Sequence, residues 1–202
     1  LSLFLLETEE HRVLYTGGEA GDEKPAWGAD DCPGPPPLNF SPHGIHVSER
    51  ADGALQLLVV QHAGRESVEF FEVRGAGIDR SLAWRGCAVA PARAWLNAVA
   101  AVPGGGFVTT SMMERLGTDA DQSEALHAPI SSGYVATWSA AEGFGLLPGS
   151  EGARPNGIEV SHDGRYVFLN SSGEDQVQRI LRATGEVKAT TEIIGLDNAR
   201  WA

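Results

Sequence analysis

The stretch "GARPNGIEVSHDGRYVFLN", residues 152–170, places two turn signals close together. The second signal, Asp163-Gly164 between alternating apolar and polar residues, predicts a β-hairpin. The first signal, Asn156-Gly157, opens a short apolar run and has no hairpin partner upstream. A side-chain amide at the entrance of a strand suits either a turn residue or a ligand to something bound there. Recurrence of the pattern elsewhere in the chain favours the second interpretation.

The pattern does recur, as a polar residue that starts a strand. His43-Gly44-Ile45 repeats it upstream, Asn97 lies between Leu96 and Ala98-Val99, and Asp197-Asn198 begins a last partial copy. Spacings of 54, 59 and 42 residues separate His43, Asn97, Asn156 and Asn198, as in four-stranded propeller blades with insertions. The first strand of every blade lines the central channel of a propeller, so we expect these side chains to form a ring near its axis.

The composition agrees with this fold class. The chain has 25 glycines, 11 prolines and 42% hydrophobic residues, which is typical of many short strands and turns, and no segment has helical periodicity. We therefore predict an all-β protein, a β-propeller of the six-bladed type with about four blades in a single incomplete domain, residues 1–202. Strand-like runs are found at 3–6, 44–47, 55–61, 68–73, 96–102, 107–110, 134–138, 157–160, 166–170, 176–181 and 187–193.

Two segments interrupt the strands, and one run has a mixed pattern. Residues 16–42 and 111–132 are polar or rich in Gly and Pro, so we expect long loops over the propeller, either binding loops or solvated excursions. The run at 68–73 mixes apolar and polar residues, which predicts a half-exposed strand.

The charge balance excludes several classes of partner. There are 15 basic and 27 acidic residues, a net charge of −12, and no run of Lys or Arg, which argues against nucleic acid and against an anionic membrane surface. No apolar run approaches the roughly 20 residues that span a bilayer. Two cysteines, Cys32 and Cys87, do not imply a disulfide framework, and whether they pair stays open. The compartment also stays open: a signal segment before Leu1 would predict a secreted or periplasmic protein.

The predicted ring has the chemistry of a hard-cation site. Amide and carboxylate oxygens suit Ca²⁺, which takes about 6–8 oxygen ligands, and no CxxC or HxxxH pattern offers zinc a comparable set. An ion held largely by neutral amides keeps enough charge to polarise a carbonyl oxygen. His43, at the edge of the ring, could act as general base toward water. The residues therefore predict hydrolysis of a small ester or lactone.

With these residues, the chain resembles the calcium-dependent six-bladed propeller hydrolases over most of residues 38–202. These are the serum paraoxonase (arylesterase/lactonase) family and the related gluconolactonase, SMP-30 and luciferin-regenerating group. The stretches that carry the resemblance are "FSPHGIHV", "LLVVQHAGRESVEFFEV", "LNAVAAVPGGGFVTT", "SGYVATW", "PNGIEVSHDGRYVFLN" and "LDNARWA".

The resemblance implies a role for each candidate residue. The ligands of one catalytic calcium would be Asn97, Asn156, Asp197 and Asn198. His43 would be the base, and His62, which by itself would pass for the solvent end of a strand, would be its proton-shuttling partner. Residues 111–132 fall where the family carries a loop that shapes substrate choice.

Three departures from the family pattern limit what is carried over. The Glu ligand of the family would lie upstream of Leu1. Ala98 stands where the family has an Asp that holds a structural calcium, so we do not expect that second ion. Gln61 replaces an Asn before the second histidine. The stretch is too short for six blades, and we expect open sheet edges and little activity from it alone.

Two other functions remain as alternatives. One is a non-catalytic propeller that binds or scaffolds, and the other is a strictosidine-synthase-like propeller that works without the calcium ring. The identity of the lactone or ester and the oligomeric state are not specified by these residues.

Overall fold

The computed structural model describes residues 1–19, 27–115 and 133–201. Within these ranges the chain forms β-strands and one short 3₁₀ helix, η1 (Gly77–Asp79), which confirms the all-β prediction. The strands are β1 (Ser2–Leu5), β2 (Glu10–Val13), β3 (Pro42–Glu49), β4 (Leu55–Gln61), β5 (Ser67–Arg74), β6 (Ser81–Val89), β7 (Ala94–Ala101), β8 (Phe107–Glu114), β9 (Tyr134–Ser139), β10 (Gly143–Leu146), β11 (Pro155–Val160), β12 (Tyr166–Ser171), β13 (Gln176–Leu181) and β14 (Glu186–Glu192).

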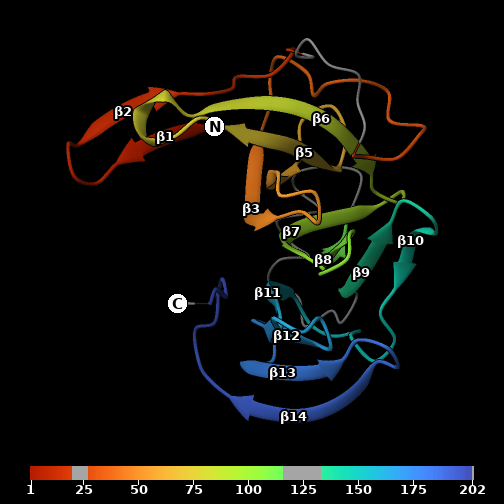
Figure 1. The fold of residues 1–202 in the computed structure, drawn as a ribbon. Coiled ribbons are helices and arrows are strands. Elements are labelled where there is room, and N and C mark those ends of the chain that lie inside the picture. The colour runs from red at the N-terminus through yellow and green to blue at the C-terminus, as the bar shows by residue number, and fades with distance from the viewer. Residues whose placement is uncertain (20–26, 116–132, 202) are drawn as a thin grey trace. The chain divides into compact units, whose positions relative to one another are not determined.

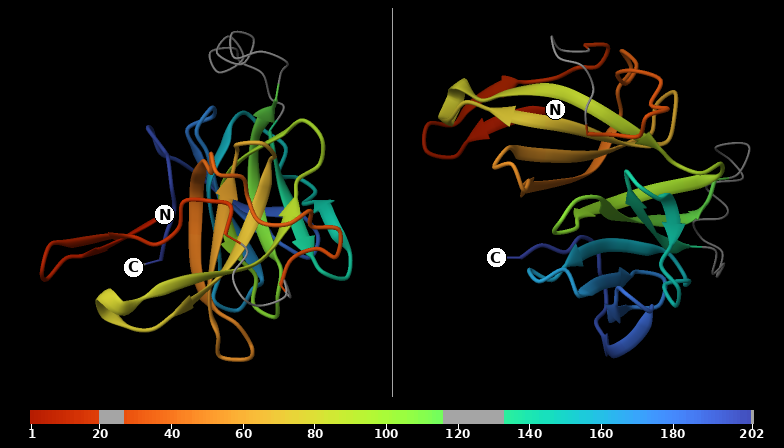
Figure 2. Two further views of the ribbon diagram at one scale, coloured as in Figure 1. Left: turned by 90° about the horizontal axis from the view of Figure 1, so that it is seen from above. Right: turned by 45° about the vertical axis from the view of Figure 1, so that its right-hand side comes forward.

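Consecutive strands pair into antiparallel meanders (Figure 1). The described residues form three four-stranded sheets, β3–β6, β7–β10 and β11–β14, and one two-stranded sheet, β1–β2. In each four-stranded sheet the strands lie side by side in sequence order, as the turned views also show (Figure 2). The three sheets resemble the blades of a propeller. A fourth blade was expected to begin at Leu196, but residues 196–201 are irregular backbone beside β11.

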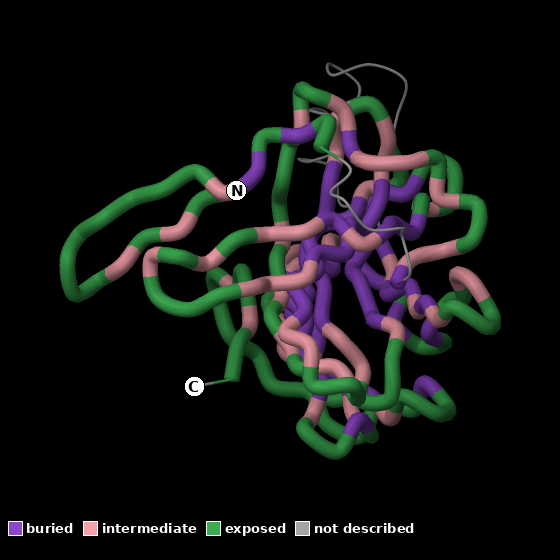
Figure 3. Tube along the Cα trace, turned by 45° about the horizontal axis from the view of Figure 1, so that its top comes forward, coloured by how far each residue is buried: buried purple, intermediate pink, exposed green. Residues whose placement is uncertain are grey.

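The chain divides into two compact units, Leu1–Val89 and Ala90–Ala202. Each unit has its own apolar core, and buried backbone follows the strands of the sheets (Figure 3). One buried cluster of the first unit consists of Tyr15, Leu57, Val59, Phe71, Trp84 and Cys87. One buried cluster of the second unit consists of Ala98, Ala100, Val108, Val135, Leu147, Ile158, Val160, Val167, Leu169 and Ile180.

A disulfide joins Cys32 to Cys87 in the first unit. It fixes the segment 27–41 beside β6, where the backbone amides of Trp27 and Ala29 donate to the carbonyls of Arg85 and Cys87 at 3.1 and 2.8 Å. Segment 27–41 has no strands, as expected for a loop, but at 27–29 it covers the outer edge of the first sheet. Residues 20–26 of the expected loop lie outside the described residues.

The strand β5 is more buried than its mixed pattern predicts. Ser67–Phe71 are all buried, and the Glu69 side chain is fully enclosed. Its carboxylate accepts hydrogen bonds from Arg65 Nη2 at 2.8 Å and from Trp84 Nε1 at 2.8 Å. The expectation of a half-exposed strand was therefore wrong for this run, because a paired carboxylate is buried where the pattern suggested solvent.

The second expected loop also begins later than predicted. β8 continues through Ser111–Glu114, which the sequence pattern assigned to a loop, and residues 116–132 lie outside the described part of the chain. Across the described residues, no helix is both long enough and apolar enough to traverse a bilayer.

Candidate functional site

Each candidate residue at a strand entrance lies at an irregularity of the same kind. The pairing register shifts between Pro42 and Ile45 in β3, between Leu96 and Val99 in β7, and between Pro155 and Ile158 in β11. His43, Asn97 and Asn156 fall inside these three shifts, on the first strand of each four-stranded sheet. A bulge leaves one residue unpaired in the sheet and changes the direction of its side chain. The repeat seen in the sequence therefore corresponds to a backbone irregularity that recurs in the first strand of each sheet.

In the second unit, the segment after Leu196 lies directly on Gly157. The Gly157 amide donates to the Asp197 carbonyl at 3.0 Å. A Cβ on Gly157 would lie 2.3 Å from that carbonyl oxygen and 2.7 Å from the Ala199 nitrogen. The structure thus brings Asp197-Asn198 against the Asn156-Gly157 pair, although Asp197 follows Asn156 by 41 positions in the chain.

Asn170 secures the same carbonyl from the neighbouring strand. It is 5% exposed at the end of β12, and its Nδ2 donates to the Asp197 carbonyl oxygen at 3.0 Å. With two donors on one oxygen, the backbone of Asp197 is fixed relative to β11 and β12. The side chains of Asp197 and Asn198 remain exposed.

Thr110 connects the irregularities in β7 and β11. Its hydroxyl accepts a hydrogen bond from the Ala98 amide at 3.0 Å and donates to the Asn156 carbonyl at 2.7 Å. The hydroxyl thus satisfies a backbone donor in one bulge and a backbone acceptor in the other. The Thr110 hydroxyl thus links the backbone of Ala98, the residue after Asn97, to the backbone of Asn156.

The Asn156 side chain supplies a test of whether a cation fits. Its Oδ1 is buried and has no hydrogen-bond partner. A buried acceptor without a donor costs about 1–3 kcal/mol, so such an atom calls for an explanation. A hard cation at this oxygen would supply the missing interaction, and so would an ordered water. Asn97 is 9% exposed, and its Nδ2 lies 3.4 Å from Met112 Sδ, so its donor end is already engaged.

Few of the candidate metal ligands carry a negative charge. Among the residues that the structure describes, no group of three or more His, Cys, Asp or Glu side chains could hold a metal ion. A cation at the second unit would therefore depend on amide oxygens and on Asp197 as the carboxylate. That set suits Ca²⁺, which accepts neutral oxygen ligands, better than zinc.

The two candidate histidines lie together in the first unit. The rings of His43 and His62 are edge-to-face with centroids 5.1 Å apart. His62 follows β4, and its amide donates to the Ser41 carbonyl at 3.2 Å. The buried Gln61 side chain accepts from the Ser41 amide at 2.8 Å, so the longer amide in place of Asn anchors the entrance of β3.

Sequence reasoning missed Glu66, Thr110 and Asn170. Glu66 Oε1 lies 2.9 Å from His62 Nδ1, across the turn that joins β4 to β5. A histidine and a carboxylate four residues apart in a turn carry no signal, because the contact depends on the path of the turn. Thr110 and Asn170 carried a weak signal, since each is the polar last residue of a predicted strand-like run.

The comparisons with known proteins give no family. No model of a protein family matches the chain, and no curated protein matches it. Among solved structures, 32 chains match. One is a catalytically inactive variant of virginiamycin B lyase from Staphylococcus aureus, solved with quinupristin, at 12% identity and a TM-score of 0.45. The match covers 79% of this chain and 44% of the lyase chain, so this chain spans less than half the length of that protein.

Proposed function

We propose that this protein is a calcium-dependent hydrolase of lactones or aryl esters. The observation that carries the proposal is the buried, unpartnered Oδ1 of Asn156, next to the point where Asp197 and Asn198 lie against Gly157. The residues that would hold the ion are Asn97, Asn156, Asp197 and Asn198. Bound there, calcium would polarise the substrate carbonyl and stabilise the negative charge that develops on its oxygen.

The histidine pair supplies the proton chemistry that hydrolysis needs. His43 would take a proton from the attacking water while the water oxygen forms a bond to the carbonyl carbon. His62, 5.1 Å away between ring centroids, would receive that proton and return it to the leaving oxygen as the ester bond breaks. With water as the only other reactant, a lactone gives one hydroxy acid, and an aryl ester gives a carboxylic acid and a phenol.

Measurements of thermal stability test whether the protein binds calcium at the proposed site. At a calcium concentration about a hundredfold above Kd, the wild-type protein should gain about 2.7 kcal/mol, or roughly 5–10 °C in Tm. Asn156→Ala should lose this gain. In chelator the variant should be as stable as wild type or more so, because it no longer buries an unpartnered oxygen.

The controls distinguish calcium bound at a specific site from a general effect of ionic strength. Asn39→Ala removes an exposed amide and should respond to calcium like wild type. Magnesium at equal ionic strength should stabilise less. If calcium shifts wild type and Asn156→Ala equally, the Asn156 site is refuted and an ordered water explains the orphan oxygen.

The catalytic arm is tested by turnover of a lactone and aryl ester panel with calcium or chelator. We expect activity that chelation abolishes, and a loss of about 100-fold or more in His43→Gln, in line with removal of a general base. His11→Gln, at an exposed position, is the matched control. Calcium-dependent stability without turnover would instead indicate a binding module.

A further inference from the structure

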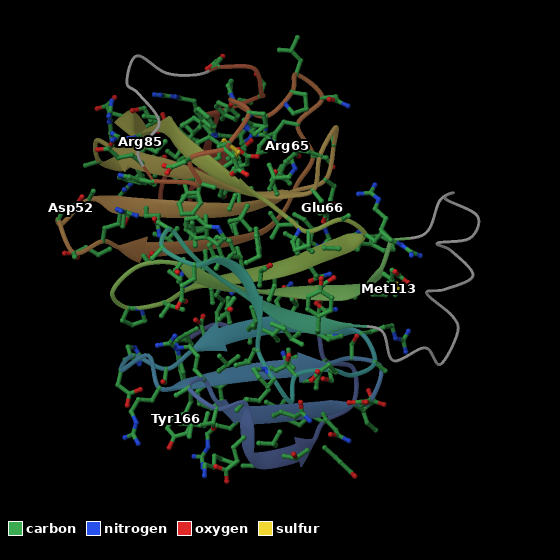
Figure 4. All side chains as sticks on the ribbon, turned by 90° about the vertical axis from the view of Figure 1, so that its right-hand side faces the viewer. Asp52, Arg65, Glu66, Arg85, Met113 and Tyr166 are labelled. Atoms are coloured by element: carbon green, nitrogen blue, oxygen red, sulfur yellow. A yellow bond between two sulfur atoms is a disulfide. The ribbon has the colours of Figure 1, made fainter. Side chains whose placement is uncertain are left out.

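Glu66 contacts one member of the histidine pair, His62. Its Oε1 lies 2.9 Å from His62 Nδ1, and the two side chains are 9% and 17% exposed. Figure 4 shows Glu66 beside Arg65 in the turn between β4 and β5. At this distance and burial the contact is a directed hydrogen bond rather than a solvated surface pair.

The arginine next to Glu66 pairs with a different carboxylate. Arg65, next in the chain, directs its guanidinium to Glu69, with Nε and Nη2 at 3.1 and 2.8 Å from Oε1, and Nη2 also donates to the Gly34 carbonyl. The two carboxylates on either side of Ser67 therefore have different partners: Glu69 holds Arg65, and Glu66 holds His62.

The backbone around His62 is fixed independently of Glu66. The His62 amide is bonded to Ser41, and the Gln61 side chain bridges the Ser41 amide and the Ala63 carbonyl. The position of the ring thus comes from the strand end, and what Glu66 adds is the orientation and protonation pattern of the imidazole.

We infer that Glu66 is a positioning residue that selects the tautomer of His62. A carboxylate can only accept, so Nδ1 carries the proton and Nε2 presents the lone pair. In that state His62 can receive a proton at Nε2 while the carboxylate stabilises the resulting imidazolium, as buried carboxylates do for other catalytic histidines. The catalytic consequence rests on the proposed hydrolase function; the tautomer does not.

The tautomer is measured directly by ¹⁵N NMR of the histidine side chains, in slightly alkaline buffer where imidazoles are neutral. We expect wild-type His62 to be protonated at Nδ1, and Glu66→Ala to shift it toward the Nε2–H form. Glu49→Ala, at an exposed position on β3, should leave the His62 signals unchanged. An unchanged tautomer in Glu66→Ala overturns the inference whatever the activity.

Steady-state kinetics then test whether the orientation of His62 by Glu66 contributes to turnover. Glu66→Ala should lower kcat about tenfold or more with KM within twofold, and Glu66→Asp should restore part of it. In the double variant His62→Gln/Glu66→Ala, kcat should equal that of His62→Gln alone, because the two residues act as one unit. Additive losses would mean that Glu66 does not act through His62. If no lactone or ester is turned over, the proposed function fails while the NMR result still decides the tautomer.

Discussion

Gly157 shows how one missing side chain can bring two distant segments together. Its φ is not in the left-handed region, so the position does not demand glycine for backbone reasons. The requirement is space, since a Cβ would lie 2.3 Å from the Asp197 carbonyl oxygen. The glycine after Asn156 is therefore a contact surface for Asp197-Asn198 within strand β11, and not the turn residue that an Asn-Gly pair suggests.

We predict that Gly157→Ala weakens calcium binding about tenfold or more. The added methyl must push the Asp197 carbonyl away and break its bonds to the Gly157 amide and Asn170 Nδ2. Isothermal titration calorimetry measures the change. Gly152→Ala is the matched control, because its Cβ would meet only the flexible Glu174 carboxylate, at 3.3 Å. Equal calcium affinity in the two variants would contradict the prediction.

For single residues, the sequence predicted which positions lie at strand irregularities better than it predicted which side chains contact each other. The recurrence of His43, Asn97 and Asn156 at blade-like spacing identified three residues that all lie in a bulge of a first strand. It could not identify Glu66, since its bond to His62 depends on how the turn residues 62–66 are folded.

Among the elements, the segment 27–41 depends most on a covalent bond. It lies against β6 through two backbone hydrogen bonds and the Cys32–Cys87 disulfide. The approach is close because glycines face each other there: a Cβ on Gly86, whose φ is +140°, would lie 2.7 Å from the Gly28 nitrogen. The segment covers a strand edge that would otherwise be open.

We predict that Cys32→Ala/Cys87→Ala lowers the free energy of unfolding by about 2–4 kcal/mol. The disulfide closes a loop with a sequence separation of 55 residues, and the chain-entropy model gives about 4 kcal/mol for such a loop. Urea denaturation followed by tryptophan fluorescence measures the change. The calcium-induced gain in stability should persist, and an unchanged urea midpoint would refute the prediction.

The strands were predicted well where their pattern is regular. β4 and β13 begin and end at the predicted residues, 55–61 and 176–181. β6 and β10 were missed because each contains glycine and lacks a clean alternation. In β6, Gly86 adopts a φ of +140° at a register shift, so the strand is bent by tertiary contacts that the local sequence does not encode.

At the scale of the whole molecule, each of the two compact units has an apolar cluster among its described residues, one in Leu1–Val89 and one in Ala90–Ala202. We therefore expect the two clusters to respond to mutation independently, because a truncated side chain loses contacts chiefly within its own cluster. The prediction of a single incomplete propeller domain, residues 1–202, stays a prediction, and similar strands recur on both sides of Val89.

Hydrogen exchange measured by mass spectrometry should show this independence. Cys32→Ala/Cys87→Ala should accelerate amide exchange in β4 and β5 but not in β11 and β12. Ile158→Ala, which removes a fully buried side chain from the second core, should do the reverse. Equal acceleration in both units by either variant would show that the chain opens as a single cooperative body.

The Cys32–Cys87 bond also governs how the protein must be handled at the bench. Production in a reducing cytosol, or a thiol added by habit to purification buffers, would yield a polypeptide whose segment 27–41 is no longer tied to β6. Expression in an oxidising host, with the free-thiol content titrated before any assay, is therefore the condition under which loss of activity can be assigned to a mutation rather than to the preparation.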